Sequence, residues 1–136
     1  MSKKQDRELE FLVTFFNEYF PGLEAGYGEV SGVPTVRVVV LASTAVVLFC
    51  HKRKRWTMEA LFLLDPPTQD TNTAELNSLS DVISWAAKDV LWVLENWAAD
   101  EGIATAWPDV STELKRLAGE FWSTMLKVFL PSIAPQ

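Results

Sequence analysis

The sequence has few of the side chains that build most metal sites and catalytic nucleophiles. Its 136 residues include one cysteine, Cys50, and one histidine, His51. A single cysteine excludes an intramolecular disulfide and any site made of several thiolates from one chain. Neighbouring residues of a strand point to opposite faces, so Cys50 and His51 would not close on one ion. We expect no metal site and no cofactor, and this cysteine usage fits a reducing cytoplasm.

Catalytic signatures are also missing. Gly26-Tyr27-Gly28 lacks the third glycine, the following helix and the lysine of a phosphate-binding loop, and no G-x-S-x-G elbow occurs. Acidic pairs such as Asp100-Glu101, beside a helix end, are expected to be solvated surface. Cys50 as a nucleophile would need a positioned base and an orienting group. We therefore predict no catalytic residues and a non-enzymatic protein, with a small cysteine-dependent enzyme as an alternative.

Long hydrophobic runs are absent. The longest apolar stretch, residues 38–50, contains Ser43 and Thr44 and is too short to span a bilayer as a helix. The first ten residues, MSKKQDRELE, carry acids and no apolar run, unlike a secretory signal. We expect a soluble protein with no membrane partner.

Bases are nearly absent from the middle of the chain. Residues 56–113 hold eleven acids and one base, Lys88, a net charge of −10, whereas the whole chain has a net charge of −6. The segments before and after this acidic block each have a net charge of +2. Such a concentration of one charge favours association with cationic partners and carries no information about fold.

Hydrophobic periodicity predicts both helices and strands. A stripe at spacings of three and four predicts a helix over residues 4–20, which Pro21-Gly22 would end. Alternating and β-branched residues predict strands at about 24–30, 34–42, 45–51 and 56–64, although the last run also contains good helix formers. The turn-rich segment 65–72, DPPTQDTN, is expected to be a loop.

The remaining sequence reads as helical. Ser78 followed by Asp81 predicts a capping box opening a helix that runs to about Asp100, with Gly102 placed to end it. A last helix is predicted over about 111–130, and residues 103–107 form either a linker or a short extra strand. The fold class is therefore α+β: an N-terminal helix, an antiparallel sheet of three or four strands, and two long C-terminal helices packed on one face of the sheet. We expect a single domain over residues 1–130 and a flexible tail, 131–136.

Four consecutive cations interrupt the acidic chain. Lys52, Arg53, Lys54 and Arg55 precede Trp56 between two apolar runs, which favours the exposed end of a hairpin. A nucleic-acid site is the alternative, with Trp56 available to stack on a base. The overall negative charge argues against that use. Contact with an acidic protein surface, including that of a second copy, is the third interpretation.

An aromatic pair lies within the acidic block. Trp85 and Trp92 are seven residues apart, two helical turns, with Asp89 and Asn96 beside them. Aromatic anchors with a polar rim are typical of protein-binding surfaces, so we predict partner binding by these four residues and Trp107. The alternative is that another helix covers the tryptophans and that they belong to the core.

These features together predict an acidic protein-binding module whose partner is a protein with a basic surface. In size and charge the chain resembles nuclease inhibitors, immunity proteins against toxins, phage-encoded blockers of bacterial defence and secretion chaperones. A homodimer formed through the broad aromatic face of the first helix is a further expectation.

Overall fold

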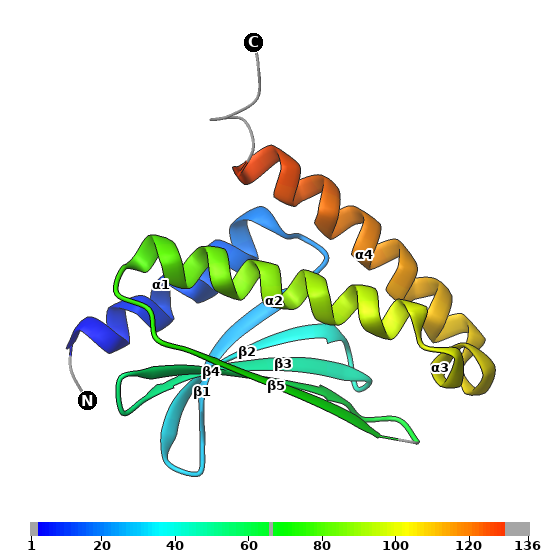
Figure 1. Cartoon of the computed structure of the whole chain (residues 1–136), viewed down its shortest axis with the longest axis horizontal. Coiled ribbons are helices and arrows are strands. Elements are labelled where there is room, and N and C mark those ends of the chain that lie inside the picture. The colour runs from blue at the N-terminus through cyan, green and yellow to red at the C-terminus, as the bar shows by residue number, and fades with distance from the viewer. Residues whose placement is uncertain (1–2, 66, 130–136) are drawn as a thin grey trace. The chain divides into compact units, whose positions relative to one another are not determined.

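The computed structural model describes residues 3–65 and 67–129, and the chain divides into two compact units, residues 1–86 and 87–136. An N-terminal helix precedes a five-stranded antiparallel sheet, and helices follow, which confirms the α+β class (Figure 1). The elements in chain order are α1 (Lys3–Tyr19), β1 (Glu24–Val30), β2 (Val33–Leu41), β3 (Ala45–Lys52), β4 (Arg55–Phe62), β5 (Thr68–Ala74), α2 (Leu79–Ala99), α3 (Glu101–Ala106) and α4 (Pro108–Phe129).

The sheet is a simple meander. Its strands lie in the order β1-β2-β3-β4-β5, and each pairs antiparallel with its neighbour in sequence. Directly paired residues share a face, so Val38, Val47 and Ala60 lie side by side, and all three are fully buried. The other face carries polar and apolar side chains that are mostly half-buried or exposed.

Helix α1 covers the buried face of the sheet beside β1 and β2 (Figure 1). Leu9, Leu12 and Phe16 recur at helical spacing and are fully buried. The ring of Phe16 stacks on that of Phe49 in β3, with centroids 6.0 Å apart and planes 16° apart. The core of the first unit is therefore an aromatic and aliphatic layer between this helix and the sheet.

Two hairpin turns contain two successive residues with left-handed backbone. Ser31 and Gly32 connect β1 to β2 with φ angles of 53° and 79°, and Arg53 and Lys54 connect β3 to β4 with 53° and 66°. Two successive positive φ angles are typical of type I′ turns, whose twist matches that of the flanking strands. Glycine or asparagine usually fills such positions, so the Arg53-Lys54 turn lacks the residues that adopt it most easily.

The sheet has one strand more than the sequence predicted. Thr68–Ala74, which overlaps the expected loop, forms β5 and pairs with β4 from Phe62–Thr68 to Trp56–Ala74. Its side chains are polar and mostly exposed, as an edge strand allows, because the backbone supplies the pairing. The predicted boundaries of β1 to β4 agree with the structure to within about two residues, and residues 55–62 form a strand.

The second unit is helical. Ser78 accepts a hydrogen bond from the Asp81 amide at 3.1 Å, so α2 begins with the predicted cap. The first turns of α2 belong to the first unit, and the rest of the helix belongs to the second. Residues 103–107, expected as a linker or strand, belong mostly to α3. Helix α4 begins at Pro108, earlier than predicted, because proline fits the first position of a helix.

Within the described residues, the helices are too short or too polar to cross a membrane. The predicted tail, 131–136, lies outside these residues. The placement of the C-terminal helices on the sheet and the single domain over 1–130 stay predictions.

Candidate functional site

Trp92 is the more exposed of the two tryptophans predicted as binding residues on the helix that follows the sheet. It lies on the part of α2 that belongs to the second unit, and 52% of its surface is accessible. Asn96, one turn later, is exposed and donates from its side-chain amide to the Trp92 carbonyl at 2.7 Å. Asp89, one turn earlier, is half-buried. This spacing places the three residues along one stripe of the helix, as expected from the sequence.

Trp85 differs from Trp92 in its surroundings. It is half-buried in the first unit, and its ring meets the Phe49 ring edge to face, with centroids 5.7 Å apart. Such a pair is a common core arrangement. The structure therefore places Trp85 partly in the core of the sheet unit and Trp92 at the surface of the helical unit.

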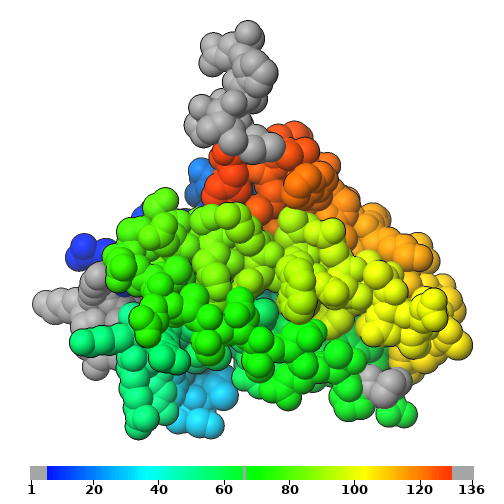
Figure 2. Space-filling model, in the orientation of Figure 1, coloured from blue at the N-terminus to red at the C-terminus, as the bar shows by residue number. Residues whose placement is uncertain are grey.

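Helix α3 brings acidic residues to the surface of the second unit. The Asp100 side chain caps α3 by accepting from the Ile103 amide at 3.0 Å, and Glu101 and Asp109 are exposed at either end of this short helix. Trp107 ends α3 and is 37% exposed. The end of α2 and α3, in yellow, reach the surface on the face seen in Figure 2. We call Trp92, Glu95, Glu101, Trp107 and Asp109 the acidic surface.

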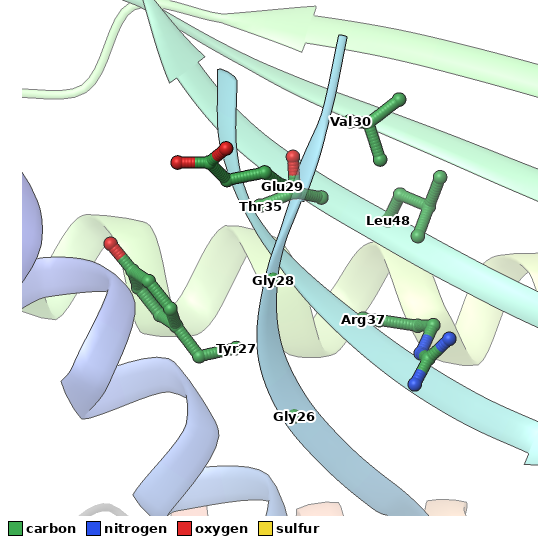
Figure 3. A pocket seen from close by; sticks show the side chains of 8 residues that line it. All are labelled: Gly26, Tyr27, Gly28, Glu29, Val30, Thr35, Arg37 and Leu48. Carbon is green, nitrogen blue, oxygen red and sulfur yellow. The ribbon is translucent and has the colours of Figure 1, made fainter. Parts of the chain in front are cut away.

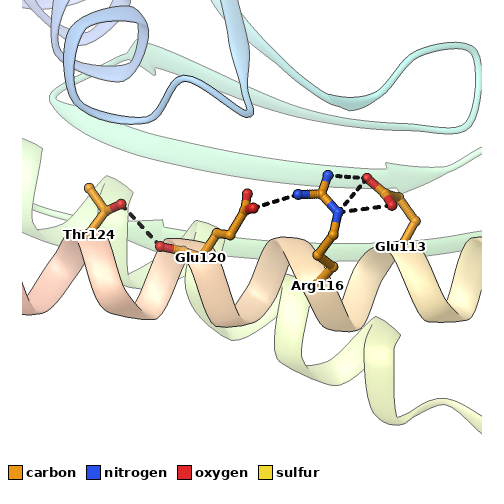
Figure 4. Close-up of polar contacts among 4 residues, drawn as sticks. All are labelled: Glu113, Arg116, Glu120 and Thr124. Carbon is orange, nitrogen blue, oxygen red and sulfur yellow. Dashed lines mark hydrogen bonds and ion pairs between the residues drawn. The ribbon is translucent and has the colours of Figure 1, made fainter.

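Two carboxylates of α4, those of Glu113 and Glu120, are engaged within their own helix. Arg116 binds both oxygens of Glu113 and donates to Glu120 at 2.5 Å (Figure 4). Hydrogen bonding by this guanidinium lowers the pKa of Glu113. Because Arg116 neutralises these carboxylates in part, Glu113 and Glu120 contribute less to the field of the unit than Glu95, Glu101 and Asp109, which have no ion pair within residues 87–129.

Trp122 was not singled out from the sequence. It lies on α4 and is 52% exposed, next to the buried Phe121. A step of one residue turns a helix by about 100°, so the helical periodicity that places Phe121 in the core already turns Trp122 away from it.

The four cations of the β3–β4 hairpin are all exposed. Lys52 pairs with Arg55 across the turn, and Arg55 forms an ion pair with Glu75 at 3.4 Å between two largely exposed side chains. An exposed pair of this kind contributes little to stability. The predicted hairpin end is confirmed, and its binding role stays a prediction.

Trp56 does not belong to this exposed group. It is fully buried, and its indole stacks on the His51 imidazole with ring centroids 4.8 Å apart and planes 10° apart. Alternation along β4 explains the difference, since Trp56 shares the buried face with Met58 and Ala60. The structure thus corrects the expectation that Trp56 could stack on a base.

The open face of the sheet contains a cavity of about 150 Å³ beside β1 (Figure 3). Glycines of β1 form one wall, and Leu48, Arg37 and Thr35 lie on the neighbouring strands. A Cβ atom added at Gly26 or Gly28 would meet nothing within 4 Å, so packing around the backbone does not require glycine at either position. The absence of two side chains keeps this part of the face open.

A second cavity of about 120 Å³ adjoins the first and shares Val30, Thr35 and Leu48 with it. Cys50 lines this cavity. Burial raises the pKa of the Cys50 thiol, as does Glu59, and Lys52 and a hydrogen bond with Thr57 oppose this rise. The protonated thiol, a weak nucleophile, therefore predominates at neutral pH.

Within residues 3–65 and 67–129, no three histidine, cysteine, aspartate or glutamate side chains converge as a metal site would require. The expected absence of metal and cofactor stays a prediction. Comparisons of this chain with models of known protein families, with curated proteins and with solved structures found no match.

Proposed function

We propose that this protein is a non-enzymatic binding module that engages a partner protein through a basic surface of that partner. The observation that carries the proposal is the exposure of Trp92. A large indole left half in water becomes favourable contact area when a partner covers it. Tryptophan is enriched among residues that dominate binding energy, and Asn96 provides a polar rim beside it.

Charge supports a basic partner. Glu95, Glu101 and Asp109 lie on consecutive elements of the second unit and are all exposed. Their combined field would attract a cationic partner over a Debye length of roughly 10 Å and accelerate association at low salt. Electrostatic attraction contributes mainly to the association rate and to specificity, whereas covering the tryptophan slows dissociation.

Inhibitors, immunity proteins and chaperone-type proteins are the classes that act in this way, and the proposal covers all three. The proposal also includes a cytoplasmic location and a phage or bacterial origin. A homodimer through α1 is supported by Phe11 and Tyr19, which are large and exposed on that helix. Nucleic acid is not part of the proposal, because Trp56 is buried and Arg55 is paired with Glu75.

Co-purification tests the proposal. The tagged protein is isolated from its native cells at low and high salt beside Trp92→Ala and a matched control, Trp122→Ala, which removes an equally exposed tryptophan from α4. We expect a protein with a basic surface to co-elute with the wild type and with Trp122→Ala at low salt only. It should be lost with Trp92→Ala. Equal recovery with Trp92→Ala, or recovery of nucleic acid alone, would contradict the proposal.

A further inference from the structure

Strand β1 is an outer edge of the sheet, and part of this edge is already closed. The backbone amide of Ala25 donates to Asn17 Oδ1 at 2.8 Å, and the Asn17 side-chain amide donates to the Ala25 carbonyl at 3.0 Å. Both backbone groups of Ala25 therefore point away from β2. Because this orientation alternates along a strand, those of Tyr27 and Glu29 point outward too.

The edge beyond Ala25 is free. Residues 27–30 are exposed, and within the described part of the chain the outward backbone groups of Tyr27 and Glu29 have no hydrogen-bond partner. An exposed row of unpaired amides and carbonyls is a template for another strand. The amide and carbonyl of Tyr27 and those of Glu29 can pair with the amides and carbonyls of two residues in an incoming strand.

The surroundings of this edge are negatively charged on the α1 side. The Tyr27 hydroxyl lies 3.4 Å from Asp6 Oδ1. Loss of hydration raises the pKa of Tyr27, and the carboxylates of Asp6, Glu10 and Glu29 raise it further. Side chains of an added strand that pointed to this side would therefore lie among carboxylates, which favours lysine or arginine.

The opposite side of the same edge carries both apolar and polar side chains. Figure 3 shows Tyr27 directed toward α1, whereas Val30, Leu48 and Arg37 lie on the other side of β1. An added strand would place every second side chain over the 150 Å³ cavity beside Gly26 and Gly28. Arg37 would repel a cation there, so an apolar side chain fits this side.

We propose that the outer edge of β1 binds an extended segment with alternating basic and apolar residues, from a partner protein, as a sixth antiparallel strand of the sheet. This inference shares with the proposed function only the assumption that the partner protein is basic. Pairing with β1 of a second copy is disfavoured, because it would bring Asp6, Glu10 and Glu29 of both copies together. Main-chain pairing supplies affinity, and the two sides of the edge supply specificity.

A defined peptide tests this edge directly. The probe is fluorescent Lys-Val-Lys-Val-Lys-Val-Lys with blocked termini, titrated with the full chain and followed by anisotropy. In antiparallel pairing the lysine amides face β1, so methylation of the lysine backbone nitrogens should weaken binding at least tenfold, since backbone hydrogen bonds are lost. Methylation of the valine nitrogens, which face solvent, should leave binding within about threefold, and a Glu-Val peptide should not bind.

Hydrogen exchange and one variant locate the site. Bound peptide should protect the amides of Tyr27 and Glu29 and leave Gly28, which already pairs with β2, unchanged. A Cβ atom at position 28 would meet nothing within 4 Å, and Gly28→Val puts a side chain into the cavity, so the fold should be kept and peptide affinity should fall at least tenfold. Trp92→Ala should bind the peptide as the wild type does, which separates this site from the acidic surface.

Three outcomes would overturn the inference. The first is no peptide binding, and the second is binding without protection of Tyr27 and Glu29. The third is protection of these amides without peptide together with a dimer in sedimentation, which would assign the edge to a second copy. Each outcome leaves the co-purification with Trp92→Ala intact as the test of the proposed function.

Discussion

Asn17 closes the first part of the β1 edge by hydrogen-bonding both backbone groups of Ala25, at 2.8 and 3.0 Å. A side-chain amide on α1 thus takes the place that a neighbouring strand would occupy. It also ties the helix to the strand that follows it, across the turn at Pro21-Gly22.

Replacing Asn17 by alanine should destabilise the fold. The substitution removes two partly buried hydrogen bonds, and the higher helix propensity of alanine offsets part of the lost stability. We therefore expect a net loss of about 1 kcal/mol in the free energy of unfolding. Urea denaturation measures this loss. The control is Glu18→Ala, an exposed neighbour, whose effect should stay within about 0.5 kcal/mol. Equal effects of the two substitutions would mean that the clamp does not stabilise the edge.

Two tryptophans of α2 should respond differently to truncation. Trp97 is buried, and Trp97→Ala should cost about 3–5 kcal/mol because it leaves a cavity in the core. Trp92→Ala should change stability by less than about 0.5 kcal/mol, since half of that side chain is in water. Thermal and urea denaturation of both variants measure the difference. A large loss on truncating Trp92 would assign it to the core and remove it from the acidic surface.

The β3–β4 turn offers a stabilising substitution. Lys54 has a φ of 66°, and a residue other than glycine pays about 1 kcal/mol for left-handed backbone. Lys54→Gly should therefore raise the free energy of unfolding by about 0.5–1 kcal/mol, measured as an upward shift in Tm. Lys52→Gly removes the same charge from the end of β3 and should lower Tm. A fall in Tm for both variants would contradict the turn geometry.

Cys50 should react slowly in the folded protein. Burial raises the pKa of its thiol, so the thiolate fraction at neutral pH is smaller than in the unfolded chain. A thiol reagent should label the native protein at least tenfold more slowly than the protein in urea, and the rate should rise with pH. The folded state holds this proton more tightly than the unfolded state. The thiol's contribution to stability is therefore fully present below the unfolded pKa and is lost as pH rises through the higher, folded pKa. Fast labelling at pH 7 would instead support the cysteine-enzyme alternative.

Much of the sheet could be predicted from the sequence because one of its faces is buried. Alternation of valines fixes which residues of β2 and β3 point inward, and the strand boundaries follow from it. Thr68–Ala74 has no such alternation of apolar residues, because it pairs at the edge through its backbone and its side chains stay in water. Its threonines were the only local indication of a strand.

The candidate site was only partly predictable, since exposure depends on which elements cover a residue. Trp85 and Trp92 are both on α2, as the sequence predicted. Phe49 of β3 packs against Trp85, however, and no pattern in the sequence predicts that contact. Trp56 follows four exposed cations and is nevertheless buried, because the strand alternation begins directly after Arg55. The free edge of β1 and its glycine-lined cavity depend on strand order, which the sequence does not specify.

Site-specific photo-crosslinking shows whether Trp92 lies in the contact with a basic partner protein. A photoreactive phenylalanine analogue replaces Trp92 in one variant and Trp122 in another, which compares two equally exposed positions. After irradiation in native cells, we predict a covalent adduct with a basic protein from position 92, reduced when lysed cells are irradiated at high salt, and no such adduct from position 122. The absence of an adduct at position 92, or the same adducts from both positions, would mean that Trp92 is not a specific contact for a basic partner.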